Sequence, residues 1–147
     1  MALWQYSFQL LPRSTEITEG DTFLNREITA NLDFWHNIQT SPLDIAEIQT
    51  ILPVGKSWND DLLIFGDSEK SCISFFIEKG FILEAELRVD LRSDFPMFLQ
   101  RMRDIEFMQK VFLLDESGYV LTINSSLIVS RIFRSEHYNK FKGFYSE

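Results

Sequence analysis

Alternation of apolar and polar residues predicts the strands of this chain. It is clearest over residues 81–91, where one set of alternate positions is apolar throughout. That set consists of Phe81, Leu83, Ala85, Leu87, Val89 and Leu91. The positions between them are mostly charged, namely Glu84, Glu86, Arg88, Asp90 and Arg92. This pattern is typical of an antiparallel sheet with one face in solvent, so we expect the charged face to be exposed.

Further strands follow from the same reasoning. Residues 3–11 alternate strictly, and short apolar runs predict the other strands at 61–66, 72–78, 110–114 and 119–123. Lys79-Gly80 and the tetrad 115–118 are turn-forming sequences, so each is expected to join two strands into a hairpin. A hairpin joins two antiparallel strands, whereas a βαβ crossover joins two parallel ones. Because hairpins predominate in this chain, the sequence favours an antiparallel or mixed sheet.

Helical periodicity occurs in three segments. Residues 41–52 begin with Ser41-Pro42, a capping sequence, and end at Pro53. Residues 94–108 form a second segment, and a third begins at Ser125 or Ser126 and continues into a polar, aromatic tail. The sequence therefore predicts an α+β fold: a mostly antiparallel sheet of about five to six strands, with about three helices packed mainly on one face.

Length and composition agree with one globular domain over residues 1–147. A chain of this size buries enough surface to fold without disulfides or metal ions, and its fourteen phenylalanines provide apolar area for a core. The N-terminus lacks the features of a signal peptide, no apolar run is long enough to cross a bilayer, and Cys72 is a single cysteine. We therefore expect a cytoplasmic protein without a membrane partner.

The negative charge is concentrated in the first half of the chain. Residues 1–69 hold eleven acidic and three basic residues, a net charge of −8, whereas residues 70–147 hold eleven of each. Such a field disfavours nucleic acid, whose phosphates require Lys and Arg. It would attract a basic protein partner, although the same charge is also what keeps an ordinary protein soluble.

No motif for catalysis or for a cofactor is present. The six glycines are too widely spaced for a phosphate-binding loop. His36 and His137 lack metal-ligand spacing, and Cys72 has no C-x-x-C partner, so we expect packing or surface roles for them. We predict no catalytic residue, no metal site and no cofactor. An active site assembled from residues distant in sequence stays an open alternative.

Aromatic and acidic residues outside the periodic segments are the candidates for binding. Trp35 and Trp58 flank the first predicted helix, and large aromatics on loops either anchor the loop to the core or act as hot spots for a partner. We predict Trp35 and Trp58 as anchors for a partner. The steering charges that we predict are Asp60, Asp61, Asp67 and Glu69.

Three short runs resemble those of a known group of proteins. They are Leu-Pro-Val-Gly-Lys-Ser-Trp at 52–58, Phe-Gly-Asp at 65–67 and Arg-Val-Asp-Leu-Arg at 88–92. They resemble small bacterial cytoplasmic proteins of unassigned function, some of which are similar to immunity proteins of polymorphic toxin systems. The resemblance covers residues 29–141. It implies a small stand-alone bacterial domain and no catalytic residues.

The sequence thus leads to a hypothesis of a non-catalytic, acidic protein-binding module. Such a module would be an immunity- or inhibitor-type protein that binds a basic protein partner. Two alternatives stay open: an enzyme of no recognised motif, and an oligomerising structural component that uses an uncovered sheet face. The oligomeric state itself does not follow from the sequence.

Overall fold

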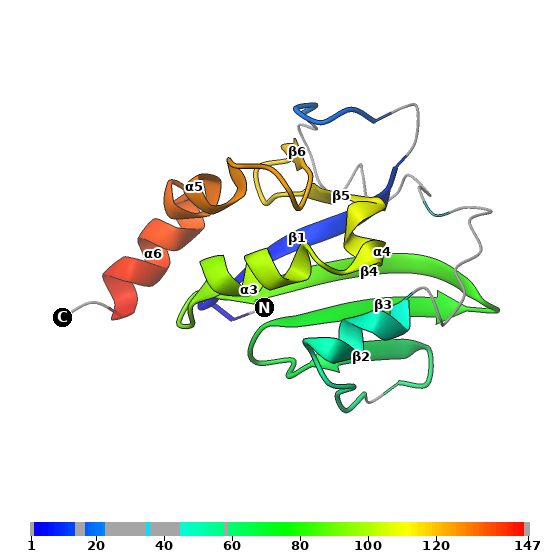
Figure 1. Cartoon of the computed structure of the whole chain (residues 1–147). Helices are drawn as coiled ribbons and strands as arrows, with labels where there is room; N and C mark the ends of the chain where they lie inside the picture. Colours follow the sequence, from blue (N-terminus) through cyan, green and yellow to red (C-terminus); the bar gives the residue numbers. More distant parts are fainter. Residues whose placement is uncertain (1, 14–16, 23–34, 36–44, 58, 146–147) are drawn as a thin grey trace.

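An antiparallel sheet organises the chain. The computed structural model describes residues 2–13, 17–22, 35, 45–57 and 59–145 (Figure 1). Six strands of this part form one sheet in the order β2-β3-β4-β1-β5-β6. The strands are β1 (Gln5–Pro12), β2 (Leu62–Gly66), β3 (Cys72–Glu78), β4 (Phe81–Asp90), β5 (Val111–Leu114) and β6 (Val120–Leu121). Every pairing is antiparallel, which confirms the predicted fold class.

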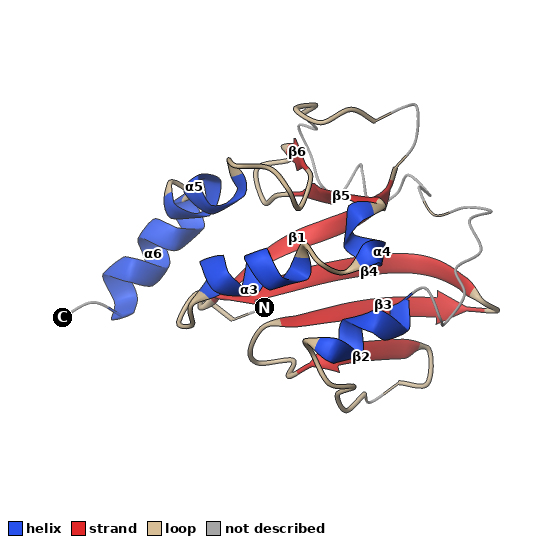
Figure 2. Ribbon diagram, in the orientation of Figure 1, coloured by secondary structure: helices blue, strands red, loops and turns tan. Residues whose placement is uncertain are grey.

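The helices cover one face and one end of the sheet. They are η1 (Glu47–Thr50, a 3-10 helix), α3 (Phe95–Met102), α4 (Glu106–Gln109), α5 (Ile128–Phe133) and α6 (Glu136–Tyr145). Figure 2 shows η1, α3 and α4 in front of the sheet, and α5 and α6 beside its end. No helix within the described ranges is long and apolar enough to cross a membrane.

Two predicted helices differ from the structure. The segment predicted as one helix over 94–108 is divided into α3 and α4, because Ile105 adopts an extended conformation with φ −80° and ψ 120°. The tail does not extend α5, but forms the separate helix α6. Of the helix predicted over 41–52, residues 41–44 lie outside the described part of the chain, and the remainder contains η1.

The central strand β1 joins the two halves of the sheet. Phe8 pairs with Leu87 of β4, and Leu10 pairs with Leu113 of β5. The side chains of Phe8 and Leu10 are fully buried beneath the helices, as the alternation of residues 3–11 predicts. β1 pairs with β4 over Gln5–Gln9 and with β5 over Gln9–Pro12, and seven of its eight residues are buried.

A β-bulge interrupts the hairpin of β3 and β4. Phe76 pairs with Glu84, but the next residue, Ile77, pairs with Ile82, so Leu83 is an extra residue on β4. The bulge reverses the alternation beyond it. Ile82 is therefore buried, whereas Leu83 and Phe81 are exposed. The uninterrupted apolar face predicted from Phe81 to Leu91 is wrong at its first two members.

A close backbone contact holds the segment before β2 against that strand. Gly55 N donates to Ile64 O at 2.7 Å, and Gly66 N donates to Pro53 O at 2.6 Å. Gly66 has φ +92°, a conformation that favours glycine. The chain segment at residues 53–55 thus covers part of the free edge of β2.

Candidate functional site

Trp35 lies in the core and offers no surface to a partner. Its side chain is 5% exposed, its indole Nε1 donates to Leu10 O at 3.2 Å, and its ring stacks on Phe107. Trp35 therefore anchors its segment to the core, the first of the two roles expected for it, and it does not belong to the candidate site. Trp58 lies outside the described residues.

The four predicted steering acids form two groups. Asp60 and Asp61 precede β2, whereas Asp67 and Glu69 follow it, and all four are exposed. None of them forms an ion pair within the part of the chain that the structure describes. The strand between the groups separates them by roughly 20 Å, which is more than a Debye length at physiological ionic strength. They cannot act as one charged patch.

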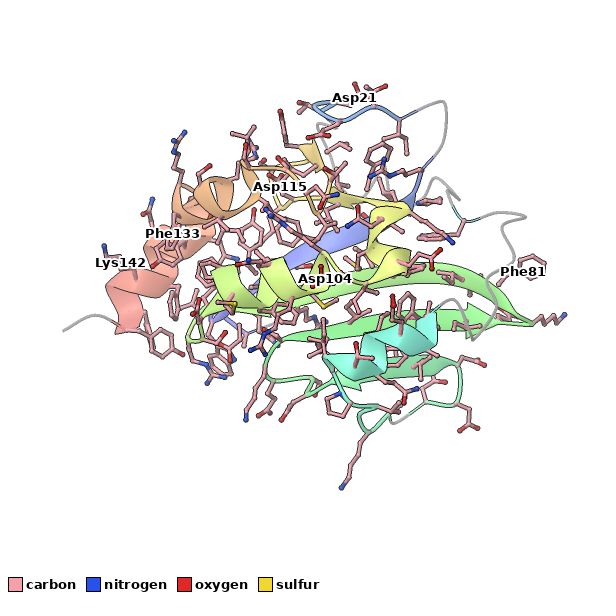
Figure 3. All side chains as sticks on the ribbon, in the orientation of Figure 1. Asp21, Phe81, Asp104, Asp115, Phe133 and Lys142 are labelled. Atoms are coloured by element: carbon pink, nitrogen blue, oxygen red, sulfur yellow. The ribbon has the colours of Figure 1, made fainter. Side chains whose placement is uncertain are left out.

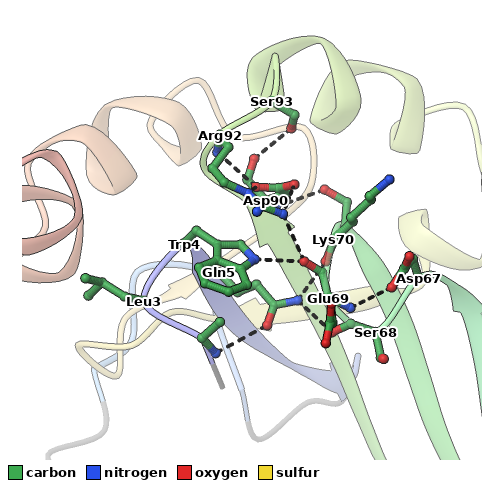
Figure 4. A network of polar contacts seen from close by, with 12 residues as sticks. Leu3, Trp4, Gln5, Asp67, Ser68, Glu69, Lys70, Asp90, Arg92 and Ser93 are labelled. Carbon is green, nitrogen blue, oxygen red and sulfur yellow. Dashed lines mark hydrogen bonds and ion pairs between the residues drawn. The ribbon is translucent and has the colours of Figure 1, made fainter. Parts of the chain in front are cut away.

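The turn that carries Asp67 and Glu69 has a structural role (Figure 4). Its main-chain oxygens accept hydrogen bonds from Trp4 Nε1, at 2.8 Å to Glu69 O, and from Gln5 Nε2, at 2.8 Å to Ser68 O. Arg92 also donates to Glu69 O, and its guanidinium lies 4.4 Å from the centroid of the Trp4 ring. This turn fixes the segment before β1 to the end of β4.

Three exposed apolar side chains gather at the end of the hairpin. Phe76 is 36% exposed, Phe81 37% and Leu83 55%. Phe75 and Ile82 point toward the core, so their chain neighbours point to the opposite face of the sheet. Figure 3 shows Phe81 at the outer end of the hairpin, away from the helices.

Two carboxylates share the face of these apolar side chains, and two more lie beside the hairpin, whose turn also holds Lys79. Glu78 pairs with Phe81, and Glu84 pairs with Phe76, so both acids lie on the same face as the phenyl rings. Ile77 N donates to Asp61 O at 2.8 Å, which places Asp60 and Asp61 beside the hairpin. We call this region the hairpin-end surface. It comprises Phe76, Phe81, Leu83, Asp60, Asp61, Glu78 and Glu84.

The exposed apolar side chains of the hairpin-end surface are not among those predicted from the sequence, although two short apolar runs indicate them. Residues 75–77 and 81–83 are each three consecutive apolar residues. Since neighbours on a strand point to opposite faces, such runs place apolar side chains on both faces at the hairpin end. The run at 81–83 is therefore incompatible with the single apolar face predicted for residues 81–91.

A polar cluster around His137 resembles a catalytic arrangement but lacks a free base. His137 Nδ1 lies 2.9 Å from Glu116 Oε1, and Nε2 lies 2.8 Å from Leu3 O. Both ring nitrogens are therefore engaged, and neither is available for proton abstraction. Burial, and then the nearby Asp115 and Glu116, raise the pKa of the Tyr6 phenol far above its ordinary value, so that it stays protonated.

Cys72 is also unsuited to nucleophilic chemistry. Its side chain is 2% exposed, and burial raises the pKa of the thiol from 9.0 to about 11. A thiolate is the reactive form, so the native thiol is inert near neutral pH. The described residues hold no group of three or more His, Cys, Asp or Glu side chains that could bind a metal ion.

The raised pKa of Cys72 makes stability fall in alkaline solution. Between pH 9 and pH 11 the unfolded thiol has lost its proton while the native thiol keeps it, so the free energy of unfolding falls as the pH rises. The expected loss is about 2–3 kcal/mol across this window. Denaturant titrations of wild type and Cys72→Ala from pH 8 to pH 11 measure it. A difference between the two proteins that is constant with pH would contradict this expectation.

Comparison with known proteins gives no match: neither a family model, nor a curated protein, nor a solved structure is similar to this chain. The resemblance to small bacterial proteins of the immunity type accordingly stays a prediction.

Proposed function

We propose that this protein is a non-catalytic, acidic binding module of the immunity or inhibitor type, which occupies a basic surface of a partner protein through its hairpin-end surface. The observation that supports this function is the arrangement of exposed Phe76, Phe81 and Leu83 on one face of the hairpin together with the carboxylates of Glu78 and Glu84. Protein interfaces commonly combine an apolar, aromatic centre with a polar rim.

The two parts of the hairpin-end surface contribute differently to binding. The carboxylates accelerate encounter with a basic partner, and this contribution weakens as salt screens the charges. Burial of the apolar side chains then slows dissociation. Each of the three is already partly covered, so its further burial contributes roughly 1 kcal/mol or more. The engaged nitrogens of His137 and the inert thiol of Cys72 favour this function over an enzyme.

Photo-crosslinking identifies the partner. Benzoylphenylalanine in place of Phe81 is expected to capture one basic protein in cells of the source organism, whereas the same probe in place of Phe144 is not. Phe144 is 74% exposed and lies on α6, at the opposite end of the molecule (Figure 1). Capture of the same proteins from both positions, or of none from Phe81, would contradict the proposal. Capture of a second copy of this chain would identify an oligomerising component instead.

Leu83→Asp is expected to weaken the captured complex by at least about tenfold in Kd, because it places a charge in the centre of the interface. Since Leu83 is 55% exposed in the free protein, the free energy of unfolding should fall by less than about 1 kcal/mol. Isothermal titration calorimetry and denaturant titration measure the two quantities. Leu127→Asp, at a residue 48% exposed on the other side of the molecule, is the matched control and should bind as wild type does.

Charge-reversal substitutions distinguish the contributions of the two acidic groups to the association rate. Asp60→Lys is expected to lower the association rate about fivefold at low salt, because Asp60 lies in the rim of the interface. Glu69→Lys carries the same charge change at the far end of β2, so it should have a much smaller effect near physiological ionic strength, where the Debye length is about 8 Å, and a more similar effect at low salt. Stopped-flow measurements at two salt concentrations make the comparison. Equal effects of the two variants would show that steering depends on net charge alone.

A further inference from the structure

A cavity of about 820 Å³ lies at the opposite end of the sheet from the hairpin-end surface. The segment before β1, the turn between β5 and β6, and helices α5 and α6 line it, and it is partly open to solvent. The polar side chains in its wall that matter here are Ser117, Arg131, Arg134, Ser135, His137 and Lys140. Its volume is within the range of small-molecule sites, about 300–1,000 Å³.

Two of the three carboxylates in the cavity wall, Asp115 and Glu116, are already bound by protein donors, whereas Glu136 is exposed. Asp115 is 1% exposed and accepts from Ser117 N and Tyr119 N at 2.9 Å, and from Arg131 Nε at 2.8 Å. Glu116 contacts His137 Nδ1 through one oxygen and accepts from Ser7 N through the other. Their charges are compensated within the wall, so neither carboxylate is available to bind a cation.

The cations, in contrast, keep free hydrogen-bond donors. Arg131 is held in place by Asp115, by Ser117 Oγ at 3.0 Å, and by the Tyr119 ring at 3.9 Å. A guanidinium has five N–H groups, so Arg131 retains donors beyond these two hydrogen bonds. Arg134 is exposed and has no acceptor in the described part of the chain.

The lining holds three acidic and three basic side chains, and the positive charge comes from helices α5 and α6. Residues 127–145 contain four basic residues and one acidic residue, Glu136. Glu136 lies 3.6 Å from Lys140, but both side chains are mostly exposed, at 86% and 67%. Such a solvated pair is weak and does not prevent Lys140 from binding another anion.

We infer that this cavity binds a small organic oxyanion, a phosphate- or carboxylate-bearing molecule, between Arg131 and Arg134. Guanidinium groups bind both kinds of oxyanion through paired charge-assisted hydrogen bonds. The hydroxyls of Ser117 and Ser135 lie in the same wall, but they already donate to Asp115 Oδ1 and to Ile132 O, so the two guanidinium groups are the donors of this site. The cavity exceeds the size of a single phosphate ion, so the ligand carries an additional organic part. This inference is independent of the proposed function.

Titration of the isotopically labelled protein with pyrophosphate and with citrate, at constant ionic strength, tests the inference by NMR. The expected result is a saturable shift of the Ser117, Ser135 and His137 amide signals with at least one of the two anions, at concentrations up to about 10 mM. Tighter binding of pyrophosphate would indicate a phosphate-bearing ligand, and tighter binding of citrate a carboxylate-bearing one. Absence of a saturable shift with both anions would overturn the inference.

A matched pair of variants locates the site. Arg134→Gln is expected to weaken binding of the tighter anion about tenfold, because it removes charge-assisted hydrogen bonds. Arg101→Gln removes another exposed arginine, from α3 and outside the cavity wall, and should bind as wild type does. Equal affinities of Arg134→Gln and wild type would overturn the inference, since they would assign any shift to non-specific binding.

Discussion

Asp115→Ala is expected to lower the free energy of unfolding by about 3 kcal/mol. The buried carboxylate binds two main-chain N–H groups of the β5–β6 turn, the hydroxyl of Ser117 and the guanidinium of Arg131. Alanine leaves all of these donors without their acceptor. This loss lies at the lower end of the range of about 3–5 kcal/mol for removing one partner of a buried ion pair, because Arg131 is 32% exposed and can turn toward water.

Denaturant titration at neutral pH measures this loss. Asp115→Asn keeps an acceptor for the turn but removes the charge opposite Arg131, so it should be about half as destabilising. A double-mutant cycle with Arg131→Ala then gives the coupling between the two side chains, expected at about 1–2 kcal/mol. Additive effects of the two single substitutions would mean that Asp115 acts only through the turn.

The second large effect is expected for Gly55→Ala, which should destabilise the protein by at least about 3 kcal/mol. A methyl group at Gly55 would collide with the carbonyl oxygen of Gly66, an atom of the main chain that cannot rotate away. Relief of the collision requires the chain at 53–55 to move off β2, which breaks the hydrogen bonds from Gly55 N to Ile64 O and from Gly66 N to Pro53 O.

Gly143→Ala is the matched control for this substitution. Gly143 lies in α6 with no atom near the position of an added Cβ, so alanine should leave stability unchanged or raise it by up to about 1 kcal/mol. Thermal unfolding of both variants tests the pair. A Gly55→Ala protein as stable as wild type would show that the contact between residues 53–55 and β2 is not close in solution.

Alternation in the sequence locates β4 well but does not reveal its bulge. The predicted strand 81–91 and the observed strand Phe81–Asp90 nearly coincide. The residue that forms the bulge is determined by the register between β3 and β4, however, and this register depends on the residues of both strands. Because Ile77 pairs with Ile82, both bury apolar side chains, and Leu83 is forced to the outer face. A single-strand pattern contains no information on this choice.

The break between α3 and α4 has a similar origin. In one continuous helix Phe107 would point about 140° away from Met102, and it could not share the buried stripe. The extended conformation of Ile105 changes the direction of the chain. As a result, Phe107 packs against Trp35 and Phe75 in the core. The free energy gained by burying the Phe107 ring offsets the loss of helical hydrogen bonds. Helical periodicity in the sequence does not predict this gain.

The charged part of the candidate site was predicted from the sequence but its apolar centre was not, although the apolar runs 75–77 and 81–83 indicate that centre. Exposed acids such as Asp60 and Asp61 are found from the sequence, because carboxylates without partners stay in water. The predicted anchor Trp35 is buried, since a large aromatic ring on a connecting segment is equally able to fill the core. Its burial depends on Phe107, which is distant in sequence.

The central position of β1 affects how the protein is made in the cell. Its neighbours are β4 and β5, so the ribosome must synthesise Leu87 and then Leu113 before Phe8 and Leu10 find their partners. At about 5–20 residues per second, this leaves an aromatic strand without its partners for several seconds. The nascent chain therefore exposes an apolar segment of the kind that aggregates or binds chaperones, and folding of the sheet is completed late in translation or after it.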